Sequence, residues 1–141
     1  MAVFVFALLV PTIAMAAHDE SASISVKQMD GTTATFNLSA KDLIGGWSVA
    51  TGDLGMDKIE EIVLGNGLGR EPRVTVLRQD GTEIGSFLAY AQTMGSGVNV
   101  VICDLTGDGL NEIITSPQRG GGPHIRVFDR FGKAIDQGGM F

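Results

Sequence analysis

Residues 104–112 are Asp104-Leu105-Thr106-Gly107-Asp108-Gly109-Leu110-Asn111-Glu112, an acidic, glycine-containing segment that lies between two apolar runs. A displacement of 51 positions carries this segment onto residues 53–61, which keep the two Asp, the Leu and the Glu at the same places. The correspondence continues beyond the segment, because residues 46–90 and 97–141 share 12 identical amino acids in 45 positions. Ordinary residue usage gives about three by chance. The sequence therefore predicts two consecutive copies of one structural unit.

Each copy is predicted to contain four short strands, because β-type runs alternate with glycine-containing turns. The strand at 98–103 is apolar at nearly every position, which predicts a strand covered on both faces. In chain order, the predicted strands are 47–51, 61–64, 73–78 and 82–88 in the first copy, and 98–103, 112–115, 124–129 and 133–135 in the second.

An additional hairpin is predicted around Asp30-Gly31, because Asp-Gly between two β-type runs favours a tight turn. Phe36 lies 51 residues before Phe87, so this hairpin corresponds to the second half of an earlier unit. Four-stranded units of about 50 residues are typical of β-propeller blades. We therefore expect an all-β chain of four-stranded β-propeller blades, with a partial blade at 22–45 and further blades at 46–96 and 97–141.

The number of units is too small for a closed ring. Closed propellers contain about 4 to 8 blades, and this chain carries about two and a half. We therefore expect a fragment of a longer product. Completion of the ring by several chains and open stacking of the blades are the alternatives.

The composition excludes some classes of function. The chain has 16 acidic and 10 basic residues and a net charge of −6, without a basic stripe that would bind nucleic acid. Cys103 is the single cysteine, so a disulfide framework within one chain is excluded. Ser96 lies outside any G-x-S-x-G context, and no nucleophile with a partnering base can be proposed. A catalytic role is therefore not expected.

The first 17 residues predict export. They carry no charge and end in a small-x-small pattern before His18, as in the apolar core and cleavage site of a secretory signal. A short membrane anchor is the alternative, but the run is marginal for the roughly 20 residues of a span, and Pro11 interrupts it. We expect a secreted, cell-surface or periplasmic protein that meets a membrane only if this segment is not cleaved.

Segment 104–112 carries the oxygen donors that calcium requires. Calcium takes about six to eight oxygen ligands on a sharply turning loop, and Gly109 gives the backbone freedom for the turn. The alternative is a metal-free Asx-type turn, in which the two Asp accept hydrogen bonds from their own backbone and Asn111 faces solvent. The expected calcium ligands are the side chains of Asp104, Thr106, Asp108 and Glu112 and the carbonyl of Leu110.

The equivalent loop at 53–61 is a poorer cation site. Gly55 offers no side-chain oxygen, and Lys58 brings a positive charge to the place of Gly109. A metal-free loop in which Lys58 neutralises Asp53 or Asp57 is therefore favoured. If this loop does bind calcium, the expected ligands are Asp53, Asp57, the carbonyl of Ile59 and Glu61.

The acidic segment with Glu112-Ile113-Ile114, the run Gly120-Gly121-Gly122-Pro123-His124-Ile125-Arg126-Val127-Phe128-Asp129 and Gly132 together resemble the FG-GAP or VCBS-type repeat of integrin-α-like β-propellers. The resemblance covers about residues 22 to 141, in two copies that are in phase. It implies a calcium loop between the first two strands of each blade and a role in extracellular binding or cell adhesion. It implies no particular ligand.

Two functions are consistent with the sequence. The favoured one is an exported, non-catalytic, calcium-dependent binding or adhesion module whose partner is an extracellular protein or glycan. The other is an accessory propeller of a secreted hydrolase or lyase whose catalytic part lies in other sequence. Self-association that completes a ring is a third, structural possibility.

Overall fold

The computed structural model describes residues 21–27, 31, 33–39 and 45–135. The expected export segment at 1–17 lies outside these residues, as do Asp30 of the expected hairpin turn and residues 136–141. The secondary structure of the described part is entirely β, as predicted. Within these ranges, no helix is long and apolar enough to cross a membrane.

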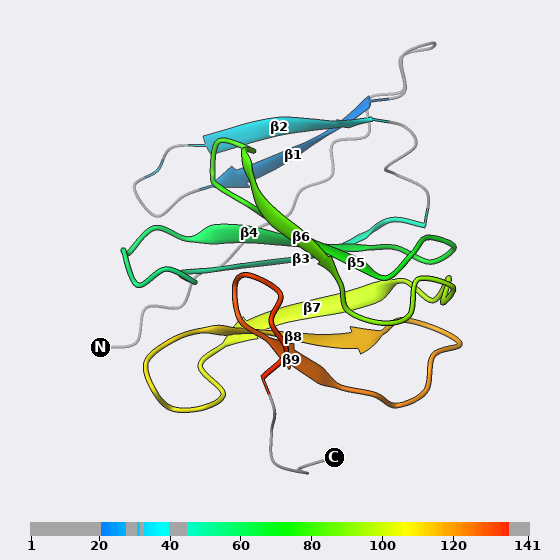
Figure 1. Ribbon diagram of the computed structural model, residues 1–141. Coiled ribbons are helices and arrows are strands. Elements are labelled where there is room, and N and C mark those ends of the chain that lie inside the picture. Colours follow the sequence, from blue (N-terminus) through cyan, green and yellow to red (C-terminus); the bar gives the residue numbers. More distant parts are fainter. Residues whose placement is uncertain (1–20, 28–30, 32, 40–44, 136–141) are drawn as a thin grey trace.

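The strands form three antiparallel sheets that are stacked in chain order (Figure 1). The first is a two-stranded hairpin, the second a four-stranded sheet in the order β3-β4-β5-β6, and the third a three-stranded sheet in the order β7-β8-β9. The bounds are β1 Ser21–Lys27, β2 Thr33–Ser39, β3 Trp47–Gly52, β4 Glu61–Asn66, β5 Arg73–Leu77, β6 Glu83–Leu88, β7 Val98–Cys103, β8 Glu112–Pro117 and β9 Arg126–Phe128.

The predicted strands coincide with the observed ones at their centres, and the differences lie at the end of the chain. The strand expected at 124–129 is reduced to β9, at Arg126–Phe128. The strand expected at 133–135 is represented by one antiparallel bridge between Phe128 and Ala134. Up to residue 135, where the described part ends, the last sheet therefore has three strands and a single bridge, whereas the middle sheet has four strands.

The two larger sheets pair their strands in the same register. In the middle sheet Trp47 faces Asn66 across β3 and β4, and Ile62 faces Leu77 across β4 and β5. In the last sheet the corresponding pairs are Val98 with Pro117 and Ile113 with Phe128. Each residue number has increased by 51, so the displacement found in the sequence also relates the hydrogen-bonded ladders.

The main core lies between the middle and last sheets. Val98 and Val100 on β7 pack against Val63 on β4 and Val74 and Val76 on β5, and all five are buried. Removal of these apolar side chains from water is the main stabilising contribution. A smaller cluster on the opposite face of the middle sheet, toward the hairpin, contains Ile62, Leu64 and Leu77, with Trp47 and Val49 packed against it.

Glycines bring β7 close to the middle sheet. A Cβ added at Gly65 would overlap the carbonyl oxygen of Val98, and one added at Gly52 would lie 2.6 Å from Cγ2 of Ile102. The backbone N–H of Val100 donates to the Ser48 hydroxyl at 3.0 Å across the same interface. The two sheets are therefore so close that a larger side chain at position 52 or 65 would clash with β7.

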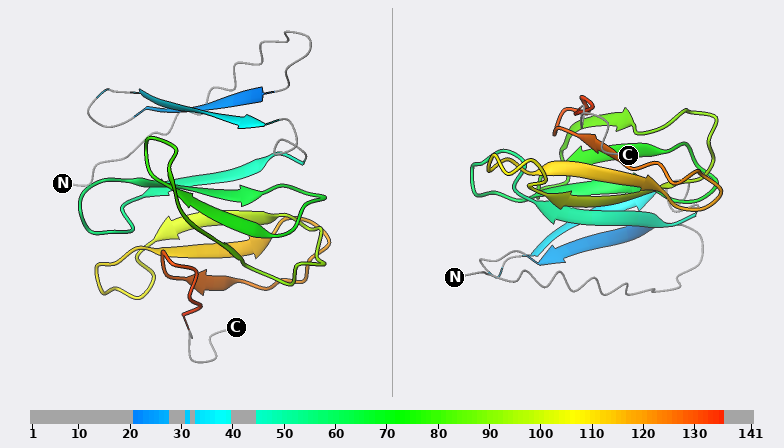
Figure 2. Two further views of the ribbon diagram at one scale, coloured as in Figure 1. Left: turned by 45° about the horizontal axis from the view of Figure 1, so that its top comes forward. Right: turned by 90° about the horizontal axis from the view of Figure 1, so that it is seen from below.

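The prediction that residues 98–103 are covered on both faces is wrong. Val98 and Val100 are buried, but the alternate residues Asn99 and Val101 are exposed, and Val101 has 56% of its surface in contact with solvent. The reason is the position of the strand in the stack, because the described residues place a sheet on one side of β7 only (Figure 2). β4, with sheets on both sides, is buried throughout.

Candidate metal centre

The two acidic loops lie at the same edge of the stack, on the left of Figure 1. Each connects the first two strands of its sheet, β3 to β4 and β7 to β8. One carboxylate closes each loop from the following strand: Glu61 Oε2 accepts the backbone N–H of Leu54, and Glu112 Oε2 accepts that of Leu105, both at 2.8 Å. Both Glu residues are buried. The Glu at the end of each acidic segment, Glu61 or Glu112, therefore closes the loop in both copies.

The first Asp of the later loop organises its backbone. Asp104 accepts hydrogen bonds from the backbone N–H of Gly107 at 2.7 Å and of Gly109 at 2.9 Å, one on each carboxylate oxygen. Asp108 accepts the N–H of Leu110 at 2.9 Å. Gly107 and Gly109 have φ angles of 77° and 89°, a region that residues with a Cβ rarely adopt. The positive φ angle of Gly109 is the backbone conformation that the sequence predicted for this glycine.

The later loop gathers its acidic side chains. Ligand oxygens of Asp104, Asp108 and Glu112 all lie within 4.8 Å of one another. The Thr106 hydroxyl lies 3.5 Å from Glu112 Oε1, on the same side as the acidic group. Leu110 donates its backbone N–H to Asp108 within the same turn. Of the expected ligands, the side chains of Asp104, Asp108 and Glu112 are thus brought together with that of Thr106, with the aspartates exposed and Glu112 at the buried base.

The earlier loop has the same fold but not the same cluster. Asp53 accepts the N–H of Gly55 at 3.0 Å and of Lys58 at 2.8 Å, and Asp57 accepts that of Ile59 at 2.9 Å. Among the described residues, only the later loop has three acidic side chains whose oxygens meet within the 4.8 Å limit. The acidic residues of both loops thus accept equivalent backbone bonds, but those of the earlier loop do not form such a cluster.

Positive charges lie beside the earlier loop. The ion pair expected between the Lys58 ammonium group and Asp53 or Asp57 is not among the salt bridges of the described residues, and Lys58 meets Asp53 through its backbone N–H. A second cation comes from the last sheet, because a Cβ at Gly55 would lie only 2.9 Å from a guanidinium nitrogen of Arg130. The Lys58 charge opposes metal binding in this loop, whereas Arg130 lies beside both loops.

The backbone bonds of the earlier loop also favour the charged form of Asp53. Burial opposes its ionisation, but the N–H groups of Lys58, Gly55, Asp57 and Met56 together outweigh this effect and lower its pKa below the ordinary value of 3.8. The carboxylate is therefore used as a fixed acceptor at the centre of the loop.

Asn111 does not face solvent as the metal-free alternative assumed. It is half-buried, and its Nδ2 donates to the backbone carbonyl of Asp53 at 2.8 Å. This hydrogen bond joins the later loop to the earlier one across the two sheets. The physical reason is the stacking, which the sequence pattern of a single loop does not contain.

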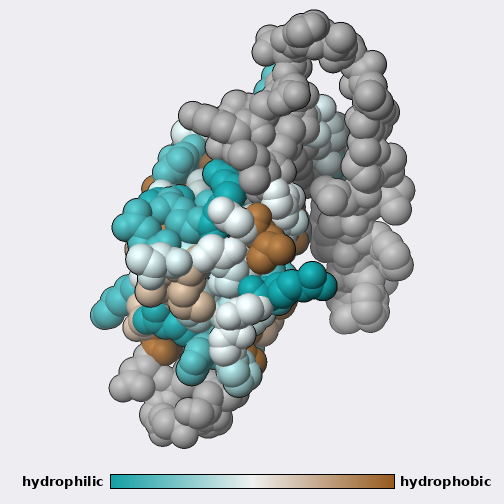
Figure 3. All heavy atoms as spheres, turned by 90° about the vertical axis from the view of Figure 1, so that its right-hand side faces the viewer, coloured by the Kyte–Doolittle hydropathy of each residue, from teal (hydrophilic) through white to brown (hydrophobic). Residues whose placement is uncertain are grey.

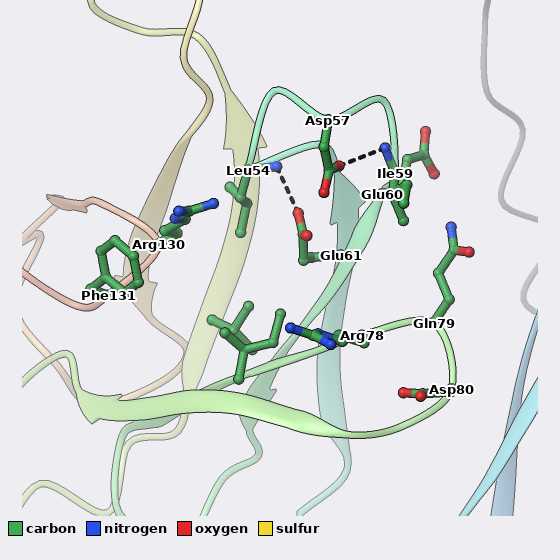
Figure 4. Close-up of a pocket in the computed structure, with 12 residues that line it drawn as sticks. Leu54, Asp57, Ile59, Glu60, Glu61, Arg78, Gln79, Asp80, Arg130 and Phe131 are labelled. Atoms are coloured by element: carbon green, nitrogen blue, oxygen red, sulfur yellow. Dashed lines mark hydrogen bonds between the residues drawn. The ribbon is translucent and has the colours of Figure 1, made fainter.

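Two hollows flank the loops. One, of about 600 Å³, lies beside the earlier loop and is lined by Glu61, by Arg78 from the turn after β5 and by Arg130 and Phe131 from the turn after β9 (Figure 4). The other, of about 500 Å³, is lined by the later loop and by the same Arg130 and Phe131. The sequence analysis missed these two residues. The 51-residue displacement, which aligns them with the turn at Gln79 and Asp80, could have placed them at this edge.

The opposite edge of the stack differs in chemistry. Figure 3 looks onto it and shows mainly hydrophilic side chains, with apolar ones in separate spots. At the loop edge, Met56, Ile59 and Phe131 are exposed apolar residues beside the acidic groups. The acidic loops, the hollows and these apolar side chains therefore share one edge.

Comparisons with known proteins identify no relative of this chain. No protein-family model, no curated protein and no solved structure matches the chain.

Proposed function

We propose that this chain is an exported, non-catalytic, calcium-dependent binding or adhesion module, built from blades of the FG-GAP or VCBS repeat type. The partner would be an extracellular protein or a glycan. The observation that carries the proposal is the cluster of Asp104, Asp108 and Glu112 in a glycine-turned loop between two strands.

The later loop fits a calcium ion in three respects. Calcium–oxygen distances are about 2.3 to 2.6 Å, so two ligands of one ion are separated by at most about 5 Å, and the three carboxylates meet this limit. A carboxylate has about four acceptor sites, so one N–H bond on each oxygen of Asp104 leaves capacity for a cation. Thr106 and the Leu110 carbonyl would complete an all-oxygen set.

Two further observations support a blade architecture. The middle and last sheets have the same strand order and register, and they pack face to face along the chain. In the chain, the hairpin β1–β2 comes directly before the middle sheet. In the same way, β5 and β6, the last two strands of the middle sheet, come directly before the last sheet. Successive propeller blades would share these features, which supports the proposed architecture.

Calcium bound to the later loop would act on this chain in one way. It would neutralise three carboxylates that otherwise repel one another, and so stabilise the edge that carries both hollows. At a calcium concentration about 100-fold above the dissociation constant, the folded state would gain about 2.7 kcal/mol.

Titration calorimetry of the full chain with calcium tests this proposal. The unaltered chain is expected to bind about one equivalent with measurable heat, as one oxygen-lined loop requires. Asp108→Asn is expected to abolish the heat, and the matched change in the other loop, Asp57→Asn, to retain it. Absence of heat from the unaltered chain, together with an unchanged melting temperature in chelator, would overturn the calcium assignment.

A further inference from the structure

The edge of the stack opposite the acidic loops carries a group of arginines. Two loops end at this edge, one between β4 and β5 and the other between β8 and β9. The segment between β6 and β7 bonds to both loops. Its Gly95 carbonyl accepts the Gly69 N–H at 2.8 Å, and its Ser96 carbonyl accepts the Arg119 N–H at 3.4 Å. We define the arginine edge by the basic residues of these loops and of the strands that follow them: Arg70, Arg73, Arg119 and Arg126.

The charges of the described residues are separated between the two edges. Glu71 is the single Asp or Glu of the described residues at the arginine edge. The other described carboxylates lie at the loop edge, in segments 53–61 and 104–112 and at Asp80, Glu83 and Asp129. A negatively charged partner is therefore repelled by the loop edge and attracted to the arginine edge.

Glu71 compensates only part of the positive charge. Its Oε1 accepts the Arg73 Nε–H at 2.6 Å, so this ion pair balances one arginine. Arg119 and Arg126 are exposed and form no ion pair with a carboxylate of the described residues. A positive surface therefore remains on a chain whose overall net charge is −6.

Two of the guanidinium groups are held in place by their neighbours. Arg126 donates from Nη1 to the Ala89 carbonyl at 2.6 Å, and its guanidinium lies 5.0 Å from the centre of the Phe128 ring. Arg73 also donates from Nη1 to the Ser86 hydroxyl at 3.4 Å. A guanidinium has five N–H donors, so both groups keep donors for a ligand. The planar fork of such a group pairs with a carboxylate through two parallel hydrogen bonds.

The surface around these arginines suits a glycan better than a protein or a nucleic acid. The core of a protein interface is apolar and depleted in charge, whereas Figure 3 shows mainly hydrophilic side chains at this edge, with apolar ones in separate spots. Single-stranded nucleic acids stack their bases on aromatic side chains. The exposed large apolar residues described at this edge are Leu68 and Ile125, which are not aromatic. Exposed Gln92 and Thr93 add polar groups.

We propose that the arginine edge binds the carboxylate groups of an acidic glycan that contains uronic acids. The inference rests on the proposed function only in taking the glycan from its two classes of partner. It does not involve calcium, because the acidic loops lie at the other edge. A test in chelator therefore separates its failure from failure of the calcium site.

The test is a titration of the full chain with a galacturonic acid oligosaccharide in chelator, observed at individual backbone amides by nuclear magnetic resonance. The amides of Gln92, Arg119 and Gly120 at the arginine edge are expected to shift. Those of Gly107 and Gly109 at the loop edge are expected to stay unchanged. A neutral galactose oligosaccharide of equal length is expected to cause no shifts, because it lacks the carboxylates that pair with guanidinium groups.

Two charge-removing variants locate the site. Arg119→Gln is expected to raise the dissociation constant about threefold, as for loss of one exposed charge pair. The Arg119 side chain makes no hydrogen bond with the described residues, so the variant is expected to stay folded, which a melting curve checks. Lys133→Gln is the matched control, because Lys133 is also exposed and positive but lies at the loop edge. This variant is expected to bind as the unaltered chain does.

Four results would overturn the proposal. The arginine edge could show no shifts at the highest oligosaccharide concentration, the two variants could weaken binding equally, or the neutral oligosaccharide could bind as strongly as the acidic one. An oligonucleotide of equal charge that shifts the same amides with higher affinity would identify a nucleic-acid site instead.

Discussion

At the scale of the residue, the two loops differ at two positions that govern backbone strain. Met56 and Lys58 adopt φ angles of 58° and 66°, where the later loop has Gly107 and Gly109. A side chain in this left-handed region costs about 1 to 2 kcal/mol relative to the right-handed one. The earlier loop therefore keeps its shape at a cost that the later loop avoids.

Lys58→Gly is expected to stabilise the fold by about 0.5 to 1 kcal/mol, because relief of strain exceeds the added freedom of the unfolded chain. Urea denaturation measures the change. Glu60→Gly is the control, since residue 60 of the same loop has no positive φ, and this variant is expected to lose stability. An equal loss in both variants would contradict the strain argument.

The lowered pKa of Asp53 predicts a dependence of stability on pH. Its contribution to folding is complete above the unfolded pKa, near 3.8, and is lost as the pH falls through the lower folded value. The free-energy difference between the unaltered chain and Asp53→Asn is therefore expected to shrink on acidification below about pH 4. Urea denaturation at pH 7 and at successively lower pH measures it. A difference that stays constant down to pH 2 would argue against this role of the carboxylate.

At the scale of the element, the close approach of β7 to the middle sheet depends on Gly65. Gly65→Ala is expected to destabilise the fold by about 1 to 3 kcal/mol, because the new methyl group forces the two sheets apart. Gly85→Ala in β6 is the control, since a Cβ there meets no atom within 4 Å. Thermal melting of the two variants checks the prediction, and similar melting temperatures would show that the sheets adjust without loss.

The strands and loops were predictable because they depend on local sequence. The 51-residue displacement located Asp53 and Asp104, and the apolar runs gave the strand centres. The burial of β7 was predicted wrongly, because an apolar sequence is compatible with a strand that is covered on one face or on both faces. Only the stack shows that Val101 lacks a neighbouring sheet in the described part of the chain.

At the scale of the whole molecule, the residues that sequence reasoning missed are those that join the sheets. Asn111 bonds to the backbone of the earlier loop across the sheets, and Arg130 reaches Gly55 from the last sheet. Neither contact has a local signature, because each depends on how two units pack. The difference in charge between Lys58 and Gly109 was evident from the sequence, whereas the contacts that Asn111 and Arg130 make between the sheets were not.

The most direct test of calcium binding by the later loop is a calcium titration observed at individual backbone amides by nuclear magnetic resonance. The Gly107 and Gly109 amides donate to Asp104, and the Lys58 amide donates to Asp53. Binding is predicted to shift the two glycine amides until about one equivalent has been added, because one loop provides the ligands. The Lys58 amide is predicted to change little. Equal shifts in both loops, or none in either, would contradict the assignment of calcium to the cluster of Asp104, Asp108 and Glu112.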